Sequence, residues 1–221
     1  SASAIGVYVA TLNGARVGNA VLAPGWTSYR HRVQVQTYDV TPLLRAGENR
    51  ISIGVGQGWA VGFIGYGRDN HYTADFVSLI AELTLTYADG TVEIIATAPD
   101  WEVFTSPVLS TDIYMGETVD LTAPIEKVGN AVRSDVRTKL VPQVGEFITE
   151  HERIAPIAVF RTPKNELVVD FGQNMTGYVE LKLCAPRGSR VVMHHAEVLD
   201  RDGNFYTENY RAAKNENVYI C

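Results

Sequence analysis

At 221 residues the chain is longer than a typical single domain, which predicts either one large domain or two of medium size. Hydrophobic residues make up 46% of the chain and charged residues 20%, an ordinary globular composition that excludes a largely disordered protein. The net charge of −6 argues against nucleic-acid binding, and no apolar run approaches the roughly 18 residues of a membrane span. We therefore expect neither a nucleic acid nor a membrane as a partner.

Short strands bounded by turn residues are expected along almost the whole chain. In chain order the strand-like runs are residues 7–12, 32–38, 50–55, 83–87, 92–95, 167–171, 178–183 and 190–194. Asn13-Gly14 after the first run is a strong hairpin signal. Residues 76–83 fit a helical or a strand period about equally, and the alternation that follows favours a strand. One helical turn is expected at residues 41–44, with Thr41 as N-cap and Pro42 at the first helical position.

This spacing of strands and turns predicts an all-β fold, with two β-sandwich, jelly-roll-like modules in tandem. The looser stretch at residues 122–149 is expected to connect a first module at residues 1–121 with a second at residues 150–221. The chain begins and stops inside strand-like runs, so we expect truncated ends and an incomplete second module. Two cysteines are too few for a disulfide framework, and Cys184 is expected to be a buried apolar residue.

The glycine-rich stretch at residues 54–67 is the most unusual segment. It does not fit a dinucleotide-binding fingerprint, because Trp59 stands where the third glycine is required and no helical pattern follows. The plainer interpretation is an irregular loop that needs positive φ angles. The alternative is a loop whose bare backbone and aromatic side chains, Trp59, Phe63 and Tyr66, approach a sugar. Aromatic faces suit the apolar C–H face of a pyranose.

Two polar clusters could support a Ca²⁺ site. Asp69 and Asn70 offer oxygen ligands for the ion and hydrogen bonds for sugar hydroxyls, although an Asx turn is the default interpretation. Glu117 and Asp120 form a second acidic cluster. The plainer interpretation is that their carboxylates stabilise a turn or cap backbone N–H groups. Glu117 would join a Ca²⁺ site if its segment lies beside the glycine-rich loop.

Other charged runs have ordinary explanations. Residues 200–211 fail as a calcium EF-hand, because Phe205 and Arg211 replace the required Gly and Glu, and a hairpin turn is expected instead. Residues 30–32 (Arg-His-Arg) and 194–197 (His-His-Ala-Glu) are each expected to form a solvated strand face. No nucleophile elbow, P-loop or zincin motif is present, so we assign no catalytic residue.

Several long, collinear runs resemble the bacterial α-L-rhamnosidases of glycoside hydrolase family 78. They are residues 12–18 (Leu-Asn-Gly-Ala-Arg-Val-Gly), 22–29, 36–41, 56–59 (Gly-Gln-Gly-Trp), 112–120, 169–177, 195–200 and 202–209. The resemblance implies that the first module is similar to the N-terminal substrate-recognition domain, which in some members binds rhamnose with Ca²⁺. It implies that Asp69 and Asn70 occupy the position that contacts sugar and metal in those members. The second module resembles the concanavalin-like sandwich that precedes the catalytic domain.

In that family the catalytic part is an (α/α)6 barrel with a general acid and a general base, and it hydrolyses terminal α-L-rhamnosides with inversion. Nothing in this sequence corresponds to that barrel. The expected function is therefore a non-catalytic, substrate-recognising accessory fragment of a glycosidase. Its expected partners are L-rhamnose-containing glycosides and the missing catalytic domain of the same parent chain.

Two rival functions remain open at this point. The chain could be a purely structural support for the barrel that binds no sugar, or a small hydrolase that works alone. The expected sugar-binding residues are Asp69, Asn70, Trp59 and Tyr66, and the expected metal ligands are Asp69, Asn70 and Glu117.

Overall fold

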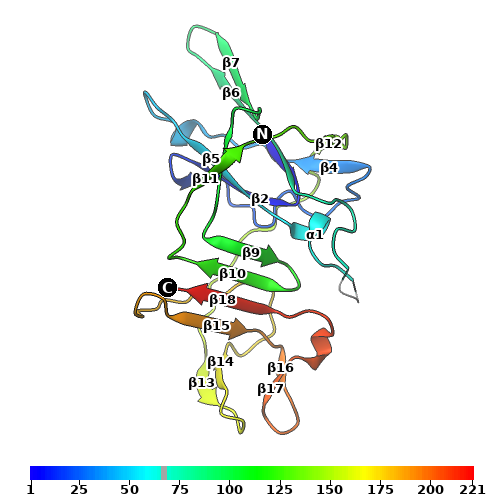
Figure 1. Ribbon diagram of the computed structural model, residues 1–221, viewed down its shortest axis with the longest axis vertical. Helices are drawn as coiled ribbons and strands as arrows, with labels where there is room; N and C mark the ends of the chain where they lie inside the picture. The colour runs from blue at the N-terminus through cyan, green and yellow to red at the C-terminus, as the bar shows by residue number, and fades with distance from the viewer. Residues whose placement is uncertain (66–68) are drawn as a thin grey trace.

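The computed structural model describes residues 1–65 and 69–221, and it is nearly all β. Figure 1 shows an elongated molecule with the early strands at one end and the late strands at the other. The strands group into two sandwich-like units in tandem, as the strand and turn spacing predicts. In the described part of the chain, helical structure is limited to α1 (Gly58–Val61) and two 3-10 turns, η1 (Thr41–Leu43) and η2 (Glu208–Tyr210). No helix among these residues is long and apolar enough to cross a membrane.

The first unit is built from two three-stranded sheets and two strand pairs. The sheets have the orders β3-β2-β5 and β1-β6-β7, and the pairs are β4–β12 and β8–β11. The bounds are β1 Ala2–Ile5, β2 Val7–Leu12, β3 Ala15–Arg16, β4 Arg32–Val35, β5 Ile51–Gly56, β6 Ser78–Thr86, β7 Val92–Ala96, β8 Glu102–Phe104, β11 Lys127–Asn130 and β12 Lys139–Pro142.

The second unit is centred on a four-stranded sheet with the order β15-β18-β10-β9, beside the hairpins β13–β14 and β16–β17. The bounds are β9 Val108–Asp112, β10 Gly116–Asp120, β13 Ala158–Arg161, β14 Leu167–Asp170, β15 Arg190–His194, β16 Val198–Leu199, β17 Phe205–Tyr206 and β18 Glu216–Ile220. Strand β10 pairs in parallel with β18, in register from Gly116 opposite Glu216 to Asp120 opposite Ile220. A hairpin from the first half of the chain therefore shares a sheet with its last strand.

After the β9–β10 hairpin the chain returns to the first unit. The segment expected as a connector, residues 122–149, contains β11 and β12, and β12 pairs in parallel with β4. Near its end, the backbone N–H of Val21 donates to Ile148 O at 2.7 Å. The boundaries at residues 1–121, 122–149 and 150–221 stay a prediction, and the segment between the modules contributes strands of its own.

Two small apolar clusters form the core of the first unit. The first contains Ala2, Ala4, Tyr8, Ala20, Ala23 and Ala81. The second contains Ile5, Tyr29, Val33, Ala60 and Val61, so it joins strands β1 and β4 to helix α1. The second cluster positions the glycine-rich stretch, because α1 lies within it and packs into this cluster.

Most predicted strands are present, and three expectations are wrong. Residues 178–183 form no strand, because no other described segment pairs with their backbone groups. The contacts of Tyr178 with Glu150 and of Glu180 with Arg153 are made by side chains alone. Cys184, in the same irregular stretch, is exposed rather than buried. The turn at Thr41–Leu43 forms, but Thr41 is not its cap: the Asp39 carboxylate accepts a hydrogen bond from the Thr41 backbone N–H at 2.9 Å.

Candidate functional site

Helix α1 presents Trp59 from a firmly anchored turn. Ala60 and Val61 are buried in the second core cluster, and Trp59 packs at the edge of that cluster. Gly58 begins the helix with a φ of +53°, and a Cβ there would meet Val7 Cγ1 at 2.7 Å. Only glycine fits this turn without strain, which explains one glycine of the Gly-Gln-Gly-Trp run.

Trp59 stacks on a second tryptophan that lies far away in the sequence. The ring centroids of Trp26 and Trp59 are 6.1 Å apart, with an interplanar angle of 8°. Trp26 is 60% exposed, which leaves much of its indole in contact with solvent. The sequence runs containing both residues stand out, but nothing in the sequence alone pairs one with the other.

The turn that carries Trp26 is held by hydrogen bonds to its backbone. Pro24 O accepts from the side-chain amides of Gln34, at 3.3 Å, and Gln36, at 3.4 Å, and the hydroxyl of Tyr29 donates to Gly25 O at 3.3 Å. Burial raises the pKa of Tyr29, so its hydroxyl stays protonated and remains a donor. The tryptophan stack is therefore preorganised on its Trp26 side as well as at α1.

Residues 69–71 lie beside the end of α1 and the residues that follow it, and they include the predicted pair Asp69 and Asn70. The Ile64 N–H donates to Asp69 O at 3.0 Å, and the His71 N–H donates to Val61 O at 2.9 Å. Asp69 and Asn70 are both exposed, and their role in binding sugar or metal stays a prediction. Tyr66, the fourth predicted sugar-binding residue, lies outside the described residues.

Sequence reasoning missed Asp112, the carboxylate that ties the glycine-rich loop to the β9–β10 hairpin. Its Oδ2 accepts from the Phe63 N–H at 2.8 Å, while Oδ1 accepts from the N–H groups of Tyr114 at 2.7 Å and Met115 at 2.8 Å. A Cβ on Gly62 would meet Asp112 Oδ2 at 2.6 Å. The hairpin segment does lie beside the loop, and Asp112 is the residue that joins them.

Glu117 lies in β10 of that hairpin, where it takes part in the pairing with β18. Its backbone N–H donates to Asn217 Oδ1 at 3.0 Å, and the Tyr219 hydroxyl donates to its Oε1 at 3.5 Å. Across residues 1–65 and 69–221, no group of three or more His, Cys, Asp or Glu could hold a metal ion. A Ca²⁺ ion at Asp69, Asn70 and Glu117 stays a prediction that would depend on backbone and amide oxygens.

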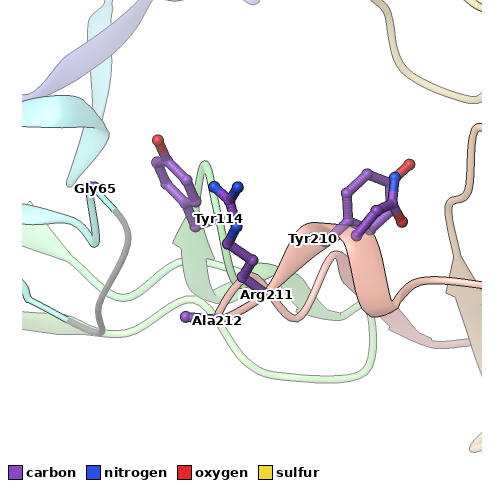
Figure 2. Close-up of a pocket in the computed structure, with 6 residues that line it drawn as sticks. Gly65, Tyr114, Tyr210, Arg211 and Ala212 are labelled. Atoms are coloured by element: carbon purple, nitrogen blue, oxygen red, sulfur yellow. The ribbon is translucent and has the colours of Figure 1, made fainter.

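A small cavity lies where the glycine-rich loop, the β9–β10 turn and the η2 segment meet. It measures about 250 Å³ and is lined by Gly65, Tyr114, Asn209, Tyr210, Arg211 and Ala212. Figure 2 shows the Arg211 guanidinium beside the ring of Tyr114, with Tyr210 further along η2. Burial, followed by the charge of Glu197, raises the pKa of Tyr210. The lining offers hydroxyl, amide and guanidinium groups, which suit polar ligands.

The run at residues 194–197 differs from the expected solvated face. His195 is half-buried and its Nε2 lies 3.1 Å from Asn217 Nδ2. Burial, followed by the charge of His194, lowers the pKa of His195. His194 is exposed and its Nε2 lies 3.4 Å from Glu216 Oε2. One histidine is thus part of the sheet's internal bonding and the other faces solvent.

Fold and site together define a tandem β-sandwich protein with an anchored, partly exposed tryptophan stack on its first unit. Residues 1–167 match the α-L-rhamnosidase N-terminal domain, and residues 160–221 match the concanavalin-like domain of bacterial α-L-rhamnosidases. The chain belongs to the bacterial α-L-rhamnosidase family.

Known α-L-rhamnosidases align with almost the whole of this chain. It is 40% identical to an α-L-rhamnosidase of Streptomyces avermitilis over 99% of its length, and 30% identical to one of Alteromonas sp. over 99%. These alignments cover 22% and 25% of the relatives, so the chain spans about a quarter or less of their length. The crystal structure of the S. avermitilis α-L-rhamnosidase complexed with L-rhamnose superposes with a TM-score of 0.93 at 37% identity, over 100% of this chain and 22% of that one.

Proposed function

We propose that this chain is the accessory, non-catalytic part of an α-L-rhamnosidase, and that its first unit recognises rhamnose-containing glycosides. The parent enzyme would be a glycosidase that hydrolyses terminal α-L-rhamnosides with inversion, and its catalytic domain would be the intramolecular partner of this part. The observation that carries the recognition role is the stack of Trp26 on Trp59, with Trp26 60% exposed.

The acid–base chemistry of the carboxyl groups supports the non-catalytic half of the proposal. A glycosidase needs a carboxylic acid whose pKa is raised so that it can protonate the leaving oxygen. Within the described residues, every carboxyl group with a clearly shifted pKa is shifted downward, chiefly by hydrogen bonds that it accepts. These groups are Asp39, Asp89, Asp120, Glu166, Asp200 and Glu216.

The exposed tryptophan suits a deoxy sugar. An indole ring carries a negative face that attracts the C–H groups of a pyranose, and the methyl group of rhamnose adds apolar area to that contact. Because both tryptophans are held from behind, little side-chain entropy is lost on binding. The exposed Asp69 and Asn70, on the loop that returns along α1, would supply hydrogen bonds and oxygen ligands for a Ca²⁺ ion shared with the sugar.

Calorimetric titration of the 221-residue chain with L-rhamnose in millimolar Ca²⁺ tests the proposal. We expect a dissociation constant on the order of 1 mM, because a monosaccharide buries little area. Trp59→Ala should abolish binding, while Trp101→Ala, which removes a tryptophan outside the stack, should not. Asp69→Ala and EDTA should each weaken binding, and the exposed Asp202→Ala serves as the charge-matched control. Absence of rhamnose binding in the unaltered chain would contradict the recognition role.

A purely structural support is the second candidate, favoured by the apolar surface of the second unit. Many of its large apolar side chains are exposed, among them Ile157 by 71%, Leu167 by 64%, Val159 by 62% and Leu183 by 50%. Such a surface suits burial against further parts of a parent enzyme. This function predicts that the titration described above shows no heat of binding with or without Ca²⁺.

A further inference from the structure

A second cavity of the first unit is lined by two arginines and by neither tryptophan of the stack. It measures about 330 Å³ and is formed by Ile5, Tyr29, Arg30, Thr73, Ala74, Val136, Arg137 and Thr138. These residues come from the end of β1 and from three loops far apart in the sequence. A volume near the lower end of the range for ligand pockets, roughly 300–1,000 Å³, suits one small ring.

Arg30 is the residue that sequence patterning assigned to a solvated strand face. In the structure it lies in the turn before β4, whereas Arg32 begins the strand. The turn is fixed from inside by Tyr29, which is 3% exposed and accepts a hydrogen bond from the Thr138 hydroxyl at its carbonyl oxygen at 2.6 Å. This bond also joins the turn to the loop that carries Arg137.

Neither arginine is neutralised by an acidic partner among the described residues. The ion pairs there are Lys127–Glu102, Arg153–Glu180, His194–Glu216 and Lys214–Glu216. Arg137 donates only to the carbonyl oxygen of its neighbour Val136, at 3.2 Å, and both side chains are exposed. Asp75 and Asp135 stand next to lining residues in the sequence and pair with neither arginine.

We propose that this cavity binds the oxyanion group of an acidic sugar, with Arg30 and Arg137 as its cationic ligands. A guanidinium presents its N–H groups in a planar fork that matches a carboxylate or a sulfate ester. The hydroxyl of Thr73 and the apolar side chains of Ile5 and Ala74 would face the ring. That a sugar carries the anion rests on the function proposed above, whereas the anion site itself does not.

In the test, the 221-residue chain is titrated separately with sodium D-glucuronate, D-glucose and sodium sulfate at low ionic strength. Binding is followed by ¹⁵N–¹H NMR at the backbone amides of residues 73, 74, 137 and 138. Glucose shares the ring of glucuronate without its charge, and sulfate supplies an oxyanion without a ring. We expect millimolar binding of glucuronate. Glucose should bind at least about tenfold more weakly, because it lacks the charge-assisted hydrogen bonds. Sulfate should also bind at least about tenfold more weakly, because it makes no ring contact with Thr73, Ile5 and Ala74.

Arg30→Gln and Arg137→Gln should each weaken glucuronate binding about tenfold. The matched control is Arg32→Gln, which removes the same charge from an exposed neighbour that does not line the cavity. Equal binding of glucose and glucuronate, or equal losses in all three variants, would overturn the anion site. Sulfate binding as tight as glucuronate would overturn the sugar part. If the chain binds glucuronate but not L-rhamnose, the anion site stands and the function proposed above is contradicted. If it binds L-rhamnose but not glucuronate, only the anion site is overturned.

Discussion

Gln36 is the most consequential buried polar side chain of the first unit, and its replacement by alanine should destabilise the fold markedly. Its relative exposure is 0%, and its side chain joins three segments. Oε1 accepts from the Tyr8 hydroxyl at 2.9 Å, and Nε2 donates to Gln143 Oε1 at 2.7 Å and to Pro24 O at 3.4 Å. Burial raises the pKa of Tyr8, so its hydroxyl is a permanent donor that needs an acceptor.

The magnitude of the Gln36→Ala effect follows from which groups lose their partners. The Tyr8 hydroxyl would lose its shortest bond and keep the longer one to Ala2 O, at 3.3 Å, together with its interaction with Tyr38. A buried polar group left short of a partner costs about 1–3 kcal/mol. The truncated side chain also leaves a small cavity, which adds about 1 kcal/mol. Gln143 is only partly buried, so water can replace its lost bond. The backbone pairing of residue 36 with Ala2 survives, and the sum is about 2–4 kcal/mol.

Urea unfolding followed by tryptophan fluorescence and by circular dichroism measures this loss. Gln173→Ala, at an exposed position in an irregular segment, is the control and should change the unfolding free energy by less than about 0.5 kcal/mol. Combining Gln36→Ala with Tyr8→Phe should be less costly than the sum of the single changes, because both remove the same hydrogen bond. A loss below about 1 kcal/mol for Gln36→Ala, or strict additivity in the double variant, would show that the bond between Gln36 and Tyr8 does not stabilise the fold as proposed.

Three further outcomes are expected. Gly62→Ala should lower stability by about 1–3 kcal/mol in the same urea assay, because its Cβ would overlap Gly58 O and Asp112 Oδ2. Gly177→Ala, which has open space around its Cβ and no positive φ, should cost less. Acidification should destabilise the second unit, because hydrogen bonds lower the pKa values of Glu166 and Asp200 in the folded state. Their contribution to stability is complete above the unfolded-state pKa near about 4 and is lost as the pH falls through the folded-state values. Asp200→Asn should therefore make the loss of stability at acid pH less steep. Finally, the chain should not hydrolyse a chromogenic α-L-rhamnoside above background, and turnover that disappears in a single carboxylate variant would show this expectation to be wrong.

How far the sequence predicts this structure depends on whether a feature is local. The runs at residues 7–12 and 190–194 become strands β2 and β15 with the expected bounds, because a short apolar run rich in valine is a local signal. Residues 178–183 are also strand-like in sequence and form no strand, since a strand also needs a neighbour to pair with. Cys184 is exposed for the same reason.

The candidate site shows the same division. Trp59, Asp69 and Asn70 belong to one loop, so the sequence could single them out together. The stacking of Trp26 on Trp59, the capping of the Phe63 N–H by Asp112 and the meeting of Arg30 with Arg137 all depend on long-range packing. No spacing rule reveals such contacts. The β10–β18 pairing, which carries part of the first half of the chain into the second unit, is non-local in the same way.

If the tryptophan stack of the first unit receives a rhamnosyl group, the indole N–H signals of Trp26 and Trp59 should respond to the sugar. A ¹⁵N–¹H NMR titration with L-rhamnose, run in parallel with L-mannose, which replaces the methyl group of rhamnose by a hydroxymethyl group, would follow both signals alongside that of Trp101. We predict saturable shifts of the Trp26 and Trp59 signals, an unchanged Trp101 signal and a weaker response to L-mannose. Unchanged Trp26 and Trp59 signals at saturating L-rhamnose would contradict it.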